Sequence, residues 1–320
     1  MSDSVLFLLL KSARPRQWIK NFAVYAALFF SGFLFYLPSD AVAYFWKVSL
    51  AFVIFCLLTS SVYIINDIID AEADRNHPFK KKRPIASGKL PVPVAIFGAG
   101  VALVGVLFLS LWLSLFFKIL VILYFLLQIL YAKYLKHIPI LDVSSIASGF
   151  LIRVYAGAVI VNLHMSVWFL LTVISASMFL AVGKRQSERT LLNGQPDSIM
   201  GSTRKILKRY SQRLLDQYTG MFATATWLTY ALFTFQNQNT YQGEIAYFYS
   251  FLPRTLHSEK LLMLTLPLVI FGVMRYLQLI YESNQGESPE RVLLNDKPLL
   301  STVFIFTLLA FFILYVIGGA

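Results

Sequence analysis

The feature that most constrains the fold of this chain is a recurring run of about twenty apolar residues that contains few charges. Of the 320 residues, 58% are hydrophobic and only 14% are charged. At about 1.5 Å of rise per residue, a helix of this length crosses a bilayer, and lipid offers no partner to unpaired backbone groups. We therefore expect an all-α, polytopic helical membrane protein. The polar stretches are only loop-sized, so residues 1–320 are expected to form one integral-membrane domain.

Nine transmembrane helices are predicted, over residues 21–38, 41–65, 93–114, 116–131, 140–161, 164–183, 218–236, 260–281 and 299–318. The third and fourth are so close in sequence that we expect a tight helical hairpin. Most of the 28 Lys and Arg residues then fall in alternate loops, and the positive-inside rule places these loops and the N-terminus in the cytoplasm. The net charge of +12 thus reflects topology and anionic lipid rather than a nucleic-acid partner.

The stretch "YIINDIIDAEADRNHPFKKKRPIASG", residues 63–88, places acidic residues at the end of the second apolar run. If the helix continues, Asn66, Asp67, Asp70 and Asp74 fall within an arc of about 100°. Like charges on one helix face repel, and acids at a helix C-terminus oppose the macrodipole, so a solvated helix end is the weaker explanation. A bound Mg²⁺ ion, which takes oxygen ligands, would offset this repulsion and is the better explanation. We predict a metal site formed by the three aspartates, with Asn66 beside them.

A group of cations follows the acidic residues at once. Two prolines break the helix here, so these side chains can converge on anionic oxygens. A metal ion next to such cations is typical of a diphosphate site. The residues expected to contact substrate here are Asn66, Arg75, Lys80 and Arg83, together with Lys20 near the N-terminus on the same side of the membrane.

A second polar segment, "YAKYLKHIPILDVSSIASGFLIRVYAGA", runs from Tyr131 to Ala158. It places Lys133, Lys136 and Asp142 at a membrane boundary, and we expect all three to bind substrate. Arg153 lies inside a span, where a charge costs about 3 kcal/mol or more, so it should face the bundle interior and hold an anion or an Asp. Snorkelling or an ion pair with Asp142 is the alternative. The small residues favour close helix packing, within one chain or in a homo-oligomer.

A third segment, "MFLAVGKRQSERTLL", ends an apolar span with Lys184, Arg185 and Glu188. We expect Lys184 to act in catalysis and Arg185 and Glu188 to bind substrate, with the two cations near a terminal phosphate. The alternative is a surface pair between Lys184 and Glu188, four residues apart on a helix.

The motif "NDIIDAEADR" resembles the Asn-Asp-x-x-Asp-x-x-x-Asp signature of the UbiA superfamily of intramembrane prenyltransferases. This resemblance implies a nine-helix bundle that holds a Mg²⁺-diphosphate in a cytoplasm-facing polar cavity. Members that use a prenyl diphosphate usually carry a second Asp-x-x-x-Asp motif, where this chain has Lys184 and Glu188 instead. A lysine cannot ligate Mg²⁺, so that position is expected to hold phosphate directly.

The chain is similar to one branch of this superfamily, which transfers a phosphoribosyl group to decaprenyl phosphate. The resemblance rests on Lys184 and Glu188 together with three further stretches, "RPRQWIKN" at residues 14–21, "HPFKKKRPIASG" at 77–88 and "ERVLLNDKPLL" at 290–300. The resemblance implies transfer from 5-phosphoribosyl-1-diphosphate to a polyprenyl monophosphate, with release of diphosphate. Asp67, Asp70 and Lys184 would be catalytic, and the product would supply arabinan precursors for a bacterial cell wall. The membrane would be the inner membrane.

Two other functions remain open at this point. The chain could join a prenyl diphosphate to an aromatic acceptor, which two Asp residues in place of Lys184 and Glu188 would favour. It could also be a transporter or a lipid-binding protein, since buried charge is common in transporters. We see no inverted repeat or paired broken helices, however, and a binding protein has little use for three carboxylates without a metal.

Overall fold

The computed structural model describes residues 4–38, 42–75, 80–192, 210–237, 260–282 and 289–317, and within these ranges it contains helices and no strand. The longer helices are α3 (Tyr44–Ile69), α5 (Val92–Ser110), α6 (Leu115–Lys133), α7 (Leu141–Ile160), α8 (Val167–Leu192), α10 (Gln212–Gln236), α12 (Leu266–Tyr281) and α14 (Lys297–Phe311). The shorter elements are α1 (Val5–Ala13), η1 (Pro15–Tyr25), α2 (Ala26–Phe30), α4 (Ala71–Arg75), η2 (Lys80–Lys82), η3 (Leu135–His137), η6 (Leu261–Thr265), α13 (Pro289–Asn295) and η7 (Phe312–Ile317). The all-α prediction is confirmed.

Seven helices in the described ranges are long and apolar enough to cross a membrane: α3, α5, α6, α7, α8, α12 extended by η6, and α14 extended by η7. The chain is therefore a multi-pass membrane protein. The other two predicted spans differ. Residues 21–38 form no single long helix, because the 3₁₀ segment η1 leads into the five-residue α2 and a turn follows at Gly32, whose φ is 81°. Residues 218–236 do lie in a long helix, α10, but it is more polar.

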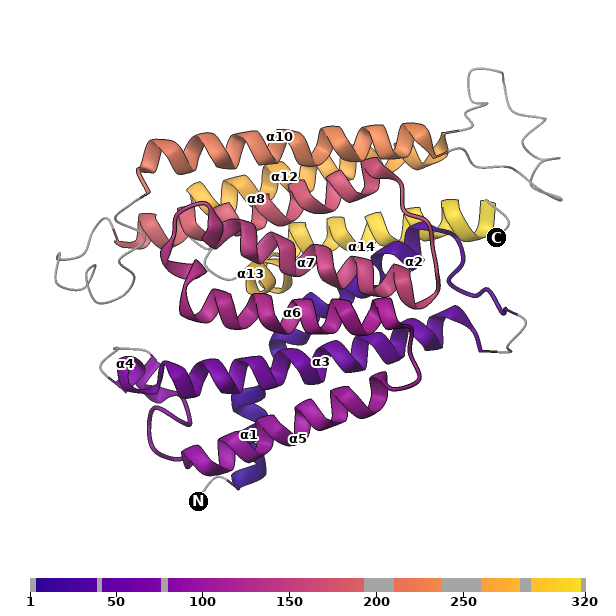
Figure 1. Ribbon diagram of the computed structural model, residues 1–320. Coiled ribbons are helices and arrows are strands. Elements are labelled where there is room, and N and C mark those ends of the chain that lie inside the picture. The colour runs from indigo at the N-terminus through magenta and orange to yellow at the C-terminus, as the bar shows by residue number, and fades with distance from the viewer. Residues whose placement is uncertain are drawn as a thin grey trace, which may run out of the picture.

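The long helices run side by side, and α1 crosses behind α3 and α5 in the view of Figure 1. Neighbouring pairs are α3 with α5, α6 with α7, α7 with α8, α8 with α10, and α12 with α14. Helices α5 and α6 do not pack against each other as the predicted tight hairpin, because each of them packs against α3 instead. The predicted short connection between them is present, since only four residues separate Ser110 from Leu115. Its turn is closed by Lys118, whose Nζ donates to the Leu111 carbonyl at 2.8 Å.

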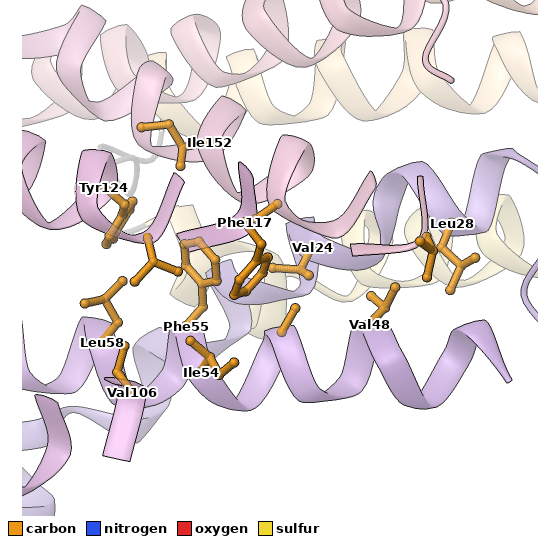
Figure 2. Packing of buried hydrophobic residues seen from close by; sticks show 14 residues of the cluster. Val24, Leu28, Val48, Ile54, Phe55, Leu58, Val106, Phe117, Tyr124 and Ile152 are labelled. Atoms are coloured by element: carbon orange, nitrogen blue, oxygen red, sulfur yellow. The ribbon is translucent and has the colours of Figure 1, made fainter. Parts of the chain in front are cut away.

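An apolar core joins η1, α3, α6 and α7 (Figure 2). Phe55 of α3 is fully buried and packs edge-on against Phe117 and Tyr124 of α6, with centroid distances of 6.4 and 5.4 Å. Val24 of η1 completes this cluster. The packing fixes η1 against the helices that carry most of the polar residues described below.

The small residues of α7 are used for packing inside the chain. A Cβ atom added at Gly157 would stand 1.8 Å from the Val24 carbonyl oxygen, so only glycine allows η1 and α7 to approach this closely. Ala156 and Ala158 on either side are also buried. From the sequence, these small residues could have packed helices either within one chain or between chains. In the structure, Gly157 and its neighbours pack within the chain.

Candidate active site

A cavity of about 770 Å³ opens among η1, α3, α6, α7, α8, α12 and α14. Five cations line it, and no Asp or Glu does among the described residues. The cations are Arg14, Lys20, Arg83, Arg153 and Lys184. Apolar side chains of α12, α13 and α14 line another part of it, including Val269, Leu293 and Val303. Because its charged groups only donate hydrogen bonds, the cavity suits a ligand that carries several anionic oxygens and an apolar part.

The first acidic group lies beside this cavity and is held by cations. Asp67 is buried, and its Oδ1 accepts from Arg14 Nη2 at 2.5 Å and from Arg83 Nη1 at 3.1 Å. Asp74 is also buried, with Oδ2 2.5 Å from the same Arg83 nitrogen and Oδ1 3.9 Å from Lys80 Nζ. Arg83 thus bridges the two carboxylates while it lines the cavity.

Asp70 departs from the arrangement that the sequence predicted. Helix α3 ends at Ile69, and Asp70 is its C-cap with φ −89° and ψ 2°, so the three aspartates do not share one continuous helix face. Asp70 instead accepts from Lys136 Nζ at 3.2 Å, and its side chain is 37% exposed. Within the described residues no three acidic, His or Cys side chains gather closely enough to hold a metal ion.

The oxygen atoms around Asp67 are nevertheless of the kind that a hard divalent cation takes as ligands. Asn66 Oδ1 is buried and has no hydrogen-bond donor among the described residues, so one oxygen next to Asp67 lacks a partner. Asn66 also lines the cavity. Carboxylate and amide oxygens are the ligands that Mg²⁺ takes from proteins. Asp67, Asp74 and Asn66 therefore fit a metal ion, with Asp70 set apart in this structure.

Arg153 faces the bundle interior, as expected, but its partners are neutral. Its Nε donates to Asn21 Oδ1 at 2.8 Å, its Nη1 to the Gly149 carbonyl at 2.9 Å, and its Nη2 to Tyr124 Oη at 2.6 Å. The guanidinium also lies 4.7 Å from the Tyr124 ring centroid. The ion pair with Asp142 weighed from the sequence is wrong, because Asp142 is committed elsewhere. No acidic side chain among the described residues pairs with Arg153, and its guanidinium group lies at the cavity wall.

The other predicted site residues of α7 and α8 form a buried network of ion pairs and hydrogen bonds. Arg185 and Asp142 are both fully buried, and Arg185 Nε and Nη2 donate to the two Asp142 oxygens at 2.5 and 2.8 Å. Arg185 Nη1 donates to Glu188 at 2.5 Å. Tyr131, at the end of α6, bonds to both Arg185 and Asp142 at 3.1 Å. Asp142, Arg185 and Glu188 were expected to touch substrate, but they stand behind the cavity wall rather than on it.

The remaining predicted residues divide by position. Lys20 and Lys184 line the cavity, whereas Arg75 and Lys133 are exposed on the surface. Sequence reasoning missed Arg14, Asn21, Tyr124 and Tyr131 as site residues. Arg14 and Asn21 are the two ends of "RPRQWIKN", so that motif carried a signal, but it did not show which partners they meet. Residues 76–79, within "HPFKKKRPIASG", lie outside the described residues.

A multi-pass helical protein with a cationic cavity beside the buried Asp67 and its neighbour Asn66 defines an intramembrane enzyme of the UbiA type, and the comparisons agree. Residues 24–189 match the model of the UbiA prenyltransferase family, and the chain belongs to that family. The decaprenyl-phosphate phosphoribosyltransferase of Mycolicibacterium smegmatis is 43% identical over 230 residues, 71% of this chain and 70% of the relative. That of Corynebacterium glutamicum is 35% identical over 301 residues, 91% and 82%.

The fold agrees with solved structures of the same family. A UbiA homologue from Archaeoglobus fulgidus, bound to GPP and Mg²⁺, superposes with a TM-score of 0.65 at 18% identity. The match covers 96% of this chain and 99% of the homologue. At this identity the likeness concerns the fold.

Proposed function

We propose that this protein transfers the 5-phosphoribosyl group of 5-phosphoribosyl-1-diphosphate to a polyprenyl monophosphate such as decaprenyl phosphate and releases diphosphate. The observation that carries the proposal is the cavity, whose lining includes five cations and no carboxylate among the described residues. The two substrates bring three anionic groups, which are the diphosphate, the ribose 5-phosphate and the lipid monophosphate, and the cavity offers cations from η1, α7, α8 and the segment before α5. The similarity to two phosphoribosyltransferases over most of the chain supports the same reaction.

The cations of the cavity have two tasks in this proposal. Arg14 and Arg83 line the cavity and also hold Asp67, so they place positive charge where the diphosphate would lie. Lys184 and Arg153 offer further positive charge at the wall, with Arg153 fixed by its three neutral partners. Fixed charges in a site that excludes water stabilise charge that develops in the transition state.

The proposed reaction needs no strong general base. An oxygen of the lipid phosphate forms a bond to ribose C1 while the bond from C1 to the diphosphate oxygen breaks, and the diphosphate leaves with the electron pair. A phosphate dianion is already a nucleophile. Mg²⁺ held by Asp67, Asp74 and Asn66 would neutralise charge on the leaving diphosphate. The solved homologue bound to Mg²⁺ supports a divalent metal in the family.

The charge pattern supports a cytoplasmic position for this end of the bundle, where the soluble sugar donor would enter from the cytoplasm of a bacterial cell. The polyprenyl chain would occupy the apolar part of the cavity near α12 and α14. The phosphoribosyl lipid would then be a precursor of the arabinan of the cell wall.

A comparison of two diphosphate donors tests the proposal. Purified protein in lipid nanodiscs would receive Mg²⁺, decaprenyl phosphate and labelled 5-phosphoribosyl-1-diphosphate, and a parallel reaction would receive a labelled prenyl diphosphate with an aromatic acceptor. We expect a labelled phosphoribosyl lipid and free diphosphate in the first reaction only. Product in the second reaction alone, from protein that is folded and monodisperse, would replace the proposal with prenyl transfer.

A further inference from the structure

The buried network behind the cavity determines what Tyr131 can offer to a ligand. The Asp142 carboxylate has no hydrogen to give, so the bond of 3.1 Å between Tyr131 Oη and Asp142 Oδ1 uses the phenolic hydrogen of Tyr131. The Arg185 guanidinium only donates, so its bond of 3.1 Å to Tyr131 Oη uses one lone pair of the phenol oxygen. One lone pair of that oxygen remains without a partner among the described residues.

This arrangement is held firmly in place. Asp142 and Arg185 are both fully buried and share two hydrogen bonds, and Arg185 also pairs with Glu188. Breaking a buried ion pair leaves an uncompensated charge and is strongly unfavourable. If the phenolic hydrogen turned toward the cavity, the fully buried Asp142 would lose one of its hydrogen bonds, so the orientation toward Asp142 is favoured. Tyr131 is among the residues that line the cavity, and in this orientation its phenol oxygen has only a lone pair to offer a ligand, in contrast to the five cations around it, which only donate.

An acceptor in this position is of no use to a phosphate, whose ionised oxygens also accept. It suits a ligand hydroxyl. We propose that Tyr131, held by Asp142 and Arg185, accepts a hydrogen bond from a ring hydroxyl of the sugar and so selects a phosphoribosyl donor over a prenyl diphosphate, which has no hydroxyl. Tyr131 is then a substrate-binding residue, and Asp142 and Arg185 are positioning residues. This inference rests on the proposed function.

The test pairs a change in the enzyme with a change in the substrate. The donors are 5-phosphoribosyl-1-diphosphate and its 2-deoxy and 3-deoxy analogues, and the proteins are the wild type, Tyr131→Phe and the control Tyr134→Phe. Tyr134 is close in sequence but exposed. We expect the wild type to prefer the parent donor over one analogue by about tenfold in kcat/KM, the value of one hydrogen bond. Tyr131→Phe should lose this preference with no change in the KM for the lipid, and Tyr134→Phe should keep it.

A second variant tests the direction of the hydrogen bond. Fluorotyrosine at position 131 keeps the shape of the side chain but makes the phenol a weaker acceptor and a stronger donor. We expect the KM for the donor to rise, whereas a role as donor to phosphate requires it to fall. The inference is overturned if the KM falls, if Tyr131→Phe keeps the wild-type preference, or if the wild type uses both deoxy donors as well as the parent. Failure of the wild type with every sugar donor would overturn the proposed function instead.

Discussion

Replacing Gly157 with alanine would force α7 and η1 apart at the point where they approach most closely. The new Cβ would stand 1.8 Å from the Val24 carbonyl oxygen and 2.8 Å from its carbonyl carbon, whereas ordinary contacts begin at 3.4 Å. Since both atoms belong to the backbone, no side-chain rotation relieves the contact. Segment η1 must move as a whole; it carries Lys20 and Asn21 of the site, and Arg14 is its N-cap residue.

The expected loss of stability follows from two opposing effects. Overpacking costs about 1–3 kcal/mol, and contact with backbone favours the upper end of that range. Alanine is a better helix former than glycine by about 1 kcal/mol, which offsets part of the cost. We therefore expect Gly157→Ala to lower the free energy of unfolding by about 2 kcal/mol. Activity should fall as well, because the bond from Arg153 to Asn21 crosses the same junction.

Two other glycines provide matched controls for this substitution. Gly100 of α5 and Gly220 of α10 have no atom within 4 Å of an added Cβ. Alanine at either position should leave stability unchanged or raise it slightly, with normal activity. Thermal unfolding of the three variants in one detergent, with turnover measured on the same samples, makes the comparison. Equal stability of Gly157→Ala and the two controls would refute the argument that this glycine is required for packing.

The remaining predictions concern charged groups. Asp67→Asn should lower turnover about 100-fold or more and weaken the dependence of activity on Mg²⁺, which a Mg²⁺ titration measures. The control Glu72→Gln changes an exposed acid nearby and should have no effect. Equal activity of the two variants would exclude a metal-binding role for Asp67. Arg275 holds the pKa of Asp296 below its usual range by hydrogen bonding. The ion pair therefore stabilises the fold fully above the unfolded-state pKa of about 4, and this stabilisation is lost as the pH falls through the lower folded-state pKa. Asp296→Asn keeps an oxygen that can cap α14 but removes the ion pair. The difference in unfolding temperature between wild type and this variant should therefore be largest at pH 7 and shrink below about pH 4. A difference that is independent of pH would contradict this assignment.

Local patterns in the sequence were sufficient to predict the class of protein and much of the candidate site. Apolar runs predict membrane helices because lipid cannot satisfy an unpaired backbone. The Asn66 and Asp67 pair and the cations that follow it predicted the polar end of the bundle, and Lys184 and Arg153, which the sequence also singled out, line the cavity. Each of these inferences needed only the identity and spacing of residues within one short segment of the chain.

Tertiary structure decided which charges meet. Asp67 pairs with Arg14, which is 53 residues away in sequence, and Asp142 pairs with Arg185, 43 residues away. Many pairings of apolar helices bury similar surfaces, so the sequence pattern could not choose among them. The end of α3 at Ile69 likewise turned Asp70 toward Lys136. The sequence by itself determined a charged cavity in a membrane bundle, and long-range packing determined which side chains line it and which support it from behind.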